Sequence, residues 1–565
     1  MTKMFRAVSW EELDRHLRAI ARVVRLSGTP EEAEAFDYVE STLQGFGFAV
    51  TRHESDALIG YPQHASLDLL GPDQRSIAAN GYSLSPGTGT EGIVAELAYV
   101  GAGMAPDYDG NDVRGKIVVS DGLAMPAKAM AARQADAIGQ IHINDEHIHE
   151  MCISPVWGTP TPDTGHLLPT VPSVGIGRED GDAIKRALSA NGTVRARLVT
   201  DPFRAWVKIP TLTADLPGNA GDDFVLFSGH VDSWHYGAMD NGTANATQLE
   251  VARLLAERRG ELRRGVRLAF WSGHSHGRYA SSAWYADFAW HDLHERCVCY
   301  VNVDSVGAIG AGVLEEAPVM AETYAFAREV LTDTVGVHLD YRRISRSSDQ
   351  SFWGHGVPTV FASLSEQGRD DSATGAALAQ LLGAGGKGGG LGWWWHTTED
   401  TLDKIDPANL ARDAGIYAET LWRLCTVDRL PFDPAAGATE IADAVAGYGQ
   451  AAGGSVDLSR TASLARDAAT AIVEALGRTS DATRANELTM RLCRLLIPVN
   501  YTRRGPFDHD LALGIRPVPG LSDAARLATL PVGSNDFHFL RTGLVREQNR
   551  VEHALRAAIR TSEGA

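Results

Sequence analysis

The spacing of apolar and polar residues divides the chain into regions of different character. Residues 10–48 carry apolar positions at helical spacing in two stretches, and the second opens with Thr29 before Pro30, a typical helix start. From about residue 59 to residue 200, short strand-like runs such as GKIVVSDG and VPSVGIG alternate with Gly and Pro turns. This pattern predicts two amphipathic helices followed by a β-rich module.

From about residue 207 onward, strands and helices are expected to alternate. The segments DFVLFSGH, GVRLAFWSGH and CVCYVNVD predict buried strands, and the longer segments between them predict helices. Such alternation indicates an α/β fold, with a mostly parallel sheet sandwiched by helices. After about residue 431 the pattern becomes largely helical.

Composition restricts the class of protein. The chain has 565 residues, which is too long for one hydrophobic core, so several domains are expected. Its formal charge of -19 argues against nucleic acid or an anionic membrane as the main partner. We find no uninterrupted apolar run of roughly 18 residues, so we expect no membrane span. Five cysteines are few and odd in number, which argues against a disulfide framework and favours a cytoplasmic location.

Candidate metal ligands follow three of the predicted strands. His230 and Asp232 end the first, His274 ends the second and Asp304 ends the third. Two further candidates are Asp240, at the start of a predicted helix, and His396, in WWWHTTEDT. A single such residue is most often a cap or a loop residue. Together they favour a divalent metal site, because imidazoles and carboxylates would meet at one edge of a parallel sheet.

The order of these motifs resembles a known family. His230-x-Asp232-Ser233, Gly237-Ala238-x-Asp240, Asn302-x-Asp304 and His396 with Asp400-Thr401-x-Asp403 are similar to the co-catalytic zinc aminopeptidase and carboxypeptidase family. The branch that the chain most resembles contains glutamate carboxypeptidase II and transferrin receptor. YVGAGMAPDYDGNDVRGKIVVSDG resembles its inserted protease-associated domain, and RLCRLLIPVNYTRRGPFDHDLALG resembles its helical dimerisation domain.

The resemblance implies a domain order and a homodimer. Residues 1–58 and 206–430 would form the catalytic domain, and residues 59–205 would form the inserted protease-associated domain. Residues 431–565 would form the helical dimerisation domain.

The resemblance also implies roles for the candidate ligands. His230, Asp240 and Asp304 would hold one metal ion, with zinc as the expected metal. Asp240 would bridge to a second ion, which His396 would also hold. Asp232 would lie behind His230 and orient its ring.

The chain departs from the family at the opening of one motif. The family has two adjacent glutamates there, the general base and a ligand of the second metal, where this chain has His274 and Ser275. A hydroxyl is a poor zinc ligand, so the second ion should bind more weakly unless His274 or His276 replaces the lost donor. A histidine can also act as a general base near neutral pH. His274 is therefore either base or ligand.

Substrate contacts are predicted at two further residues. Arg346, in YRRISRSSDQSFWGHGVPTVF, is a candidate for binding a substrate carboxylate, although a solvated charged face is an equally good interpretation. Trp395 precedes His396 directly and is predicted to line the pocket, because three consecutive tryptophans cannot all face one core.

These observations favour a metal-dependent hydrolase that is a poor peptidase on ordinary peptides. We expect it to cleave an amide or related C–N bond in a small-molecule or short peptide-like substrate, using one or two divalent ions. Two alternatives remain open. One is a metalloenzyme with non-peptidase chemistry, of the deaminase or C–N lyase type. The other is a catalytically inactive, receptor-like scaffold.

Overall fold

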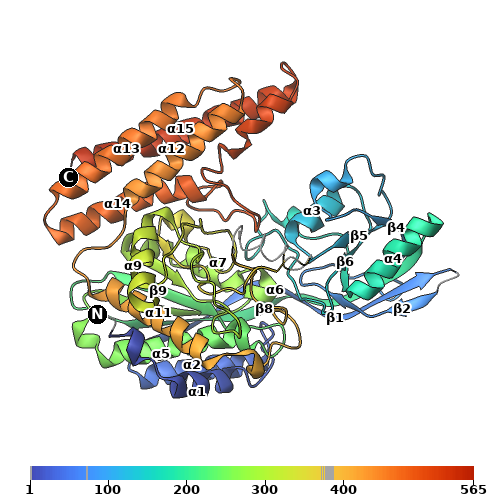
Figure 1. Ribbon diagram of the computed structural model, residues 1–565, viewed down its shortest axis with the longest axis horizontal. Coiled ribbons are helices and arrows are strands. Elements are labelled where there is room, and N and C mark those ends of the chain that lie inside the picture. Colours follow the sequence, from blue (N-terminus) through green and yellow to red (C-terminus); the bar gives the residue numbers. More distant parts are fainter. Residues whose placement is uncertain (1–2, 72–73, 371, 373–374, 376–386, 565) are drawn as a thin grey trace.

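The computed structural model describes residues 3–564 except 72–73, 371, 373–374 and 376–386. It has three parts: an α/β domain, an inserted domain beside it, and a bundle of helices packed on the α/β domain (Figure 1). The α/β fold, the inserted domain and the helical C-terminal region predicted from the sequence are therefore confirmed.

The described strands form one continuous mixed sheet, in the order β12-β11-β9-β10-β8-β4-β5-β6-β7-β3, with β1 paired to β8 and β2 paired to β1. The strands are β1 (Ala49–Leu70), β2 (Arg75–Ile77), β3 (Ala79–Gly81), β4 (Ile93–Tyr99), β5 (Ile117–Asp121), β6 (Gly139–Ile143), β7 (Ser173–Ile176), β8 (Arg195–Leu216), β9 (Phe224–His230), β10 (Gly265–Trp271), β11 (Cys297–Asn302) and β12 (Thr359–Val360). Strands β12, β11, β9 and β10 are parallel, whereas β8 pairs antiparallel with β10. The three strands predicted to carry the site therefore end at the same edge.

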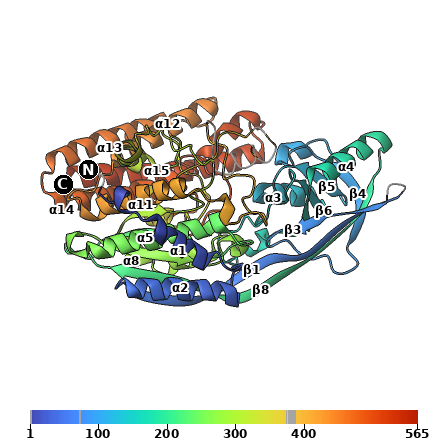
Figure 2. The ribbon, with the colours of Figure 1, turned by 60° about the horizontal axis from the view of Figure 1, so that its bottom comes forward.

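Strands β1 and β8 pair antiparallel over their whole length and run from the α/β domain into the inserted domain (Figure 2). The boundaries expected near residues 58 and 205 fall inside these strands. Pro62 pairs with Pro202, and the register shifts between Pro62 and His64. These prolines thus mark an irregularity within one continuous ribbon.

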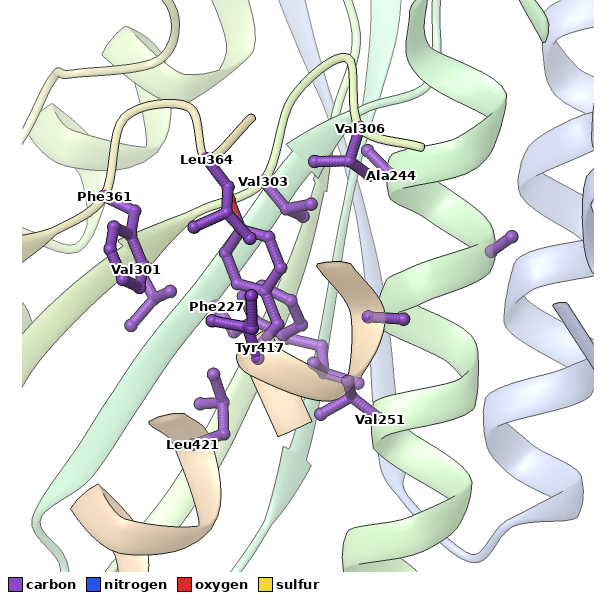
Figure 3. Close-up of a cluster of buried hydrophobic side chains, with 14 of the residues drawn as sticks. Phe227, Ala244, Val251, Val301, Val303, Val306, Phe361, Leu364, Tyr417 and Leu421 are labelled. Atoms are coloured by element: carbon purple, nitrogen blue, oxygen red, sulfur yellow. The ribbon is translucent and has the colours of Figure 1, made fainter. Parts of the chain in front are cut away.

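Helices cover both faces of the sheet in the α/β domain. The main helices are α1 (Trp10–Ile20), α2 (Pro30–Gly45), α5 (Ala244–Glu257), α7 (Ala280–Phe288), α8 (Trp290–Arg296), α9 (Tyr324–Val335) and α11 (Pro407–Thr426). Alternate residues of β9 enter different cores: Phe227 packs with α5 and α11, and Leu226 packs with α7 and α8. Figure 3 shows Phe227 beside Tyr417 and Leu421 of α11. Burial on both faces explains why these strands are almost entirely apolar.

The inserted domain and the helical bundle have cores of their own. The helices of the inserted domain are α3 (Pro126–Gln134) and α4 (Arg178–Asn191), and those of the bundle are α12 (Pro434–Ala451), α13 (Ser459–Arg478), α14 (Ala482–Tyr501) and α15 (Asn535–Glu563). Arg494 of α14 ties the bundle to the α/β domain by donating to the carbonyl oxygens of His294, Gly356 and Cys297. Across the described part of the chain, no helix combines the length and apolar character needed to cross a bilayer.

Candidate active site

A cavity lies at the edge where β9, β10 and β11 end, and its lining includes Asp240, His274, Asp304 and His396. His230 is the last residue of β9, and Asp304 follows β11 by two residues. Asp240 lies in the turn η4 (Ala238–Thr243), which leads into α5, and His274 opens the short helix α6 (His274–Gly277) after β10. The chain order predicted this convergence, because parallel strands present their carboxyl ends together.

The Asp240 carboxylate lies between two imidazoles. Its Oδ1 is 3.1 Å from His230 Nε2, and its Oδ2 is 2.9 Å from His396 Nε2. Asp304 Oδ1 lies 3.6 Å from the same His230 nitrogen. All four predicted ligands are therefore brought together, with Asp240 at the centre.

Backbone carbonyls fix the tautomers of both histidines. His230 Nδ1 lies 2.9 Å from the carbonyl oxygen of Asp232, and His396 Nδ1 lies 2.6 Å from that of Glu150. A carbonyl only accepts, so each Nδ1 carries the hydrogen and each Nε2 presents a lone pair to Asp240. Lone pairs that face carboxylate oxygens at this distance need a cation or a proton between them.

The buried atoms of this cluster meet the requirements of a divalent cation. His230 Nε2 and Asp240 Oδ1 are buried and make no hydrogen bond. Burial alone would lower the pKa of His230, but the carboxylates of Asp240 and Asp304 outweigh it and hold that pKa well above its ordinary value. The site thus attracts positive charge, and its imidazole and carboxylate donors are the ones that zinc prefers.

Two residues outside our predictions hold the Asp240 turn in place. The Asp400 carboxylate accepts hydrogen bonds from the backbone N–H groups of Met239 and Asp240, at 2.8 and 2.9 Å. The fully buried Arg25 donates to the carbonyl oxygens of Val231 and Gly237. Asp400 stands in the motif that carried the family resemblance, but Arg25 has no signal in the sequence pattern around it.

His274 points its free nitrogen toward the ligand cluster. Its Nδ1 lies 2.8 Å from Asp349 Oδ2, so the carboxylate holds the Nδ1 hydrogen and Nε2 keeps its lone pair. The His274 ring stacks on His230, with centroids 3.7 Å apart and an angle of 16° between the planes. Asp349 was not predicted, although it lies in the segment we expected to line the pocket.

Asp232 acts mainly on the α6 turn. Its carboxylate accepts from the backbone N–H groups of His274 and Ser275, at 3.2 and 2.9 Å, and from the Ser27 hydroxyl at 2.9 Å. The His230 ring is oriented by the Asp232 carbonyl and not by its carboxylate, which lies 3.7 Å away. The expected contact with His230 therefore exists, but through the backbone.

The two possible replacement ligands differ in position. Ser275 lines the cavity, and its buried hydroxyl makes no hydrogen bond. His276 is fully buried outside the cavity lining, and its Nδ1 accepts from the Ser27 backbone N–H at 3.2 Å. The structure therefore gives no support to His276 as a metal ligand.

The two predicted substrate contacts also differ. Trp395 lines the cavity and stacks on His396, with centroids 3.4 Å apart. Arg346 does not belong to the cavity lining; its guanidinium packs over Trp157 and donates to the carbonyl oxygen of Asp510. The expected substrate role of Arg346 is corrected on this ground, because its donors face protein carbonyls.

Family models match parts of the α/β domain and of the inserted domain. Residues 211–421 match Peptidase family M28, and residues 91–184 match the PA domain. The chain is 26% identical over 351 residues to "Probable glutamate carboxypeptidase VP8" of Zea mays, covering 51% of this chain and 49% of that protein. It is 26% identical over 273 residues to carboxypeptidase Q of Bos taurus, covering 46% of this chain and 57% of that one. The chain thus spans about half the length of these curated relatives.

A solved structure shares the fold at lower identity. BSAP, a zinc aminopeptidase from Bacillus subtilis, superposes with a TM-score of 0.54 at 20% identity, covering 74% of this chain and 96% of that one. Residues 211–421 are therefore a peptidase M28 region and residues 91–184 a PA domain, and together with the relatives they support a member of the co-catalytic zinc exopeptidase family.

Proposed function

We propose that the protein is a metal-dependent hydrolase that cleaves an amide bond in a small or short peptide-like substrate with His274 as its general base. The observation that carries this proposal is the placement of Asp240 between two imidazole lone pairs, with His274 directly beside them. The M28 relatives named as carboxypeptidases and aminopeptidases support the class of reaction.

The donor set favours one strong metal position and one weaker position. His230, Asp240 and Asp304 would hold the first ion. Asp240 and His396 remain for a second ion, where Ser275 offers only a hydroxyl. A zinc ion held at this site would act as a Lewis acid toward the carbonyl group of the substrate.

Ring orientation favours His274 as base and not as ligand. The ligand atoms of His230, His274 and Asp304 lie within 4.8 Å of one another, so distance alone would group them. However, an imidazole binds a metal close to its own ring plane, and two nearly parallel rings 3.7 Å apart cannot both do so for one ion. Orientation therefore excludes His274 from the ion that His230 would hold, and we propose that its lone pair serves a proton and not the second ion.

The protein groups then supply the proton transfers. His274 Nε2 takes a proton from the attacking water while Asp349 holds the Nδ1 hydrogen. The water oxygen adds to the substrate carbonyl carbon, the C–N bond breaks, and His274 Nε2–H returns the proton to the leaving nitrogen. Asp349 keeps the ring in one tautomer throughout, as a carboxylate does in other His-carboxylate pairs.

The test combines metal content with turnover. Purified protein is analysed for zinc by mass spectrometry and assayed for amine release against N-acyl amino acids, dipeptides and simple amides. His274→Ala should keep its metal and lose roughly 10²- to 10⁴-fold in rate, the usual contribution of a general base. The exposed His338→Ala is the matched control. Loss of metal in His274→Ala would make His274 a ligand, and no change in rate or metal would refute its role.

We also propose a cytoplasmic homodimer that forms through residues 431–565. The exposed side chains of Val473, Val532 and Phe539 in this region, at 61%, 85% and 71% exposure, support a covered surface in solution. All five cysteines are free and buried, which is compatible with a reducing compartment. Light scattering at micromolar concentration should give twice the chain mass, and a monomer would contradict the proposal.

A further inference from the structure

A layer of buried polar groups lies just below the strand ends that carry the site. It consists of Ser228 of β9, Trp271 of β10, and Tyr300 and Asn302 of β11, all of which are fully buried. Each lies within two residues of the carboxyl end of its strand, in strands that are otherwise mostly apolar. Polar groups in such a layer are costly unless each one is hydrogen bonded, so their hydrogen bonds indicate what the layer supports.

The hydrogen bonds of this layer run in one direction. Trp271 Nε1 can only donate, and it donates to Ser228 Oγ at 2.8 Å. The Ser228 hydroxyl lies 2.9 Å from the Tyr300 hydroxyl. The Tyr300 hydroxyl in turn lies 2.9 Å from Asn302 Oδ1 and 2.9 Å from the carbonyl oxygen of Asp349, and both of these atoms only accept. Tyr300 therefore accepts from Ser228 and donates toward these two acceptors.

Tyr300 is the point at which this chain of hydrogen bonds divides. In the first branch, Asn302 Nδ2 donates to Ser348 Oγ at 3.0 Å and to the carbonyl oxygen of Ala362 at 2.7 Å. The Ser348 hydroxyl then donates to Asp304 Oδ2 at 2.7 Å. The first branch thus ends on the carboxylate of a candidate metal ligand.

The second branch ends on the proposed base. Tyr300 donates to the backbone carbonyl of Asp349, and the Asp349 carboxylate holds His274 Nδ1 at 2.8 Å. The two branches meet in neighbouring residues of the chain, because Ser348 directly precedes Asp349. Ser348 has a φ of 54°, a left-handed conformation that a non-glycine residue keeps only where the surrounding contacts hold it.

We propose that Tyr300 is a positioning residue whose hydroxyl fixes residues 348 and 349. Through them it couples the candidate ligand Asp304 to the proposed base His274. A fully satisfied buried network fixes one geometry, and the removal of one member leaves donors and acceptors without partners. Tyr300 itself does not line the cavity, so it acts only through this network. The inference rests on the proposed function for the role of His274, but its effect on zinc binding does not require turnover.

The test compares Tyr300→Phe with a matched variant. Tyr417 is also fully buried, but its hydroxyl makes no hydrogen bond within the part of the chain that the structure describes. Zinc affinity is measured on the intact chain by competition with a chromophoric chelator, and turnover of amides is measured at saturating zinc. Tyr300→Phe should lower both quantities by about three- to thirtyfold. Tyr417→Phe should change neither by more than about twofold.

Two further variants separate the branches. Ser348→Gly removes the hydroxyl but suits the left-handed conformation better than serine does, so it would be harmless if residue 348 served only as a turn. We expect it instead to lower zinc affinity by roughly 10- to 100-fold. Asp349→Asn leaves the first branch intact, so it should lower turnover without lowering zinc affinity. Ser348→Gly also serves as the test if Tyr300→Phe does not fold.

Three outcomes would overturn the proposal. They are wild-type zinc affinity or wild-type turnover in Tyr300→Phe, equal losses in Tyr300→Phe and Tyr417→Phe, and full zinc affinity in Ser348→Gly. A different result would separate this proposal from the hydrolase function. If no amide is hydrolysed but zinc affinity falls selectively in Tyr300→Phe and Ser348→Gly, the network stands as a support of the metal site and the proposed function is refuted.

Discussion

The two halves of the active site are held by different means. On the ligand side, His230, Asp240 and His396 are fixed by backbone carbonyls and by Asp400, and their free atoms face one another. On the α6 side, His274 is held by a side chain, Asp349, and its free nitrogen faces the cavity. Under the proposed function, the first half would hold a cation and the second would hold and move a proton.

We propose that this difference lets the site change its chemistry at one place only. Each residue of the ligand side depends on its neighbours, because Asp240 contacts both imidazoles. The α6 turn depends on the backbone N–H groups that Asp232 holds, which are indifferent to the side chains of residues 274 and 275. A replacement of Glu by His or Ser therefore leaves the turn in place while altering its chemistry.

The largest effect is expected for Asp240→Ala. The loss of the carboxylate shared by both metal positions should reduce zinc to well below one ion per chain, and turnover should fall by more than about 10³-fold because several kcal/mol of Lewis-acid stabilisation are lost. Elemental analysis and turnover of the same preparation provide the measurement. Full zinc content in Asp240→Ala would mean that the ligand side has been misassigned.

A second experiment restores carboxylate side chains on the α6 side of the site. In the double variant His274→Glu with Ser275→Glu, the second position regains a carboxylate, so zinc should rise from about one to about two ions per chain. The single variant Ser275→Ala is the control and should leave the zinc content unchanged. If the double variant also gains activity on ordinary peptides, the cavity was otherwise suited to them. An unchanged zinc content would show that more than these two residues limits the second ion.

The sequence predicted the candidate metal ligands better than the residues that hold them in place. His230, Asp240 and Asp304 follow strands whose apolar runs are unambiguous, and parallel strands bring such residues together by geometry alone. Asp349 could not be placed in this way, because it lies on a loop and reaches His274 only through the packing of that loop against α6. The contribution of the Glu150 carbonyl was equally hidden, since any residue supplies one.

The domain boundaries were also harder to predict from the sequence than the order of the domains. The boundaries expected near residues 58 and 205 fall inside β1 and β8, where Pro62 and Pro202 pair with each other. Proline is tolerated at an irregularity in a strand, and nothing local distinguishes that case from a linker. The order of the domains was predictable, but the continuity of the ribbon between them was not.

A smaller effect is expected for Asp349→Asn. The amide keeps the size of the carboxylate but cannot hold the His274 tautomer as firmly, so turnover should fall by roughly 10- to 100-fold. Zinc content should stay the same, because Asp349 touches no residue of the ligand side. A matched replacement of a surface carboxylate, Asp403→Asn, should not change turnover. Loss of zinc in Asp349→Asn would indicate that His274 is a metal ligand and not the general base.

The smallest effect on function is expected for His276→Gln. His276 lies on α6 two residues after His274 but is fully buried, and burial lowers its pKa to about 4 from an ordinary 6.5. Its neutral ring therefore stabilises the folded protein fully above pH 6.5, and this contribution is lost as the pH falls from 6.5 toward 4. The difference between 6.5 and about 4 corresponds to about 3 kcal/mol.

Glutamine cannot be protonated in this range, so His276→Gln should flatten the dependence of unfolding free energy on pH between 6.5 and 4. Zinc content and turnover at pH 7.5 should stay within about twofold of the wild type, because His276 lies outside the cavity lining. Urea unfolding at several pH values, with zinc analysis of each preparation, provides the measurement. A marked loss of zinc would place His276 among the ligands after all and would break the division between a metal-holding half and a proton-moving half.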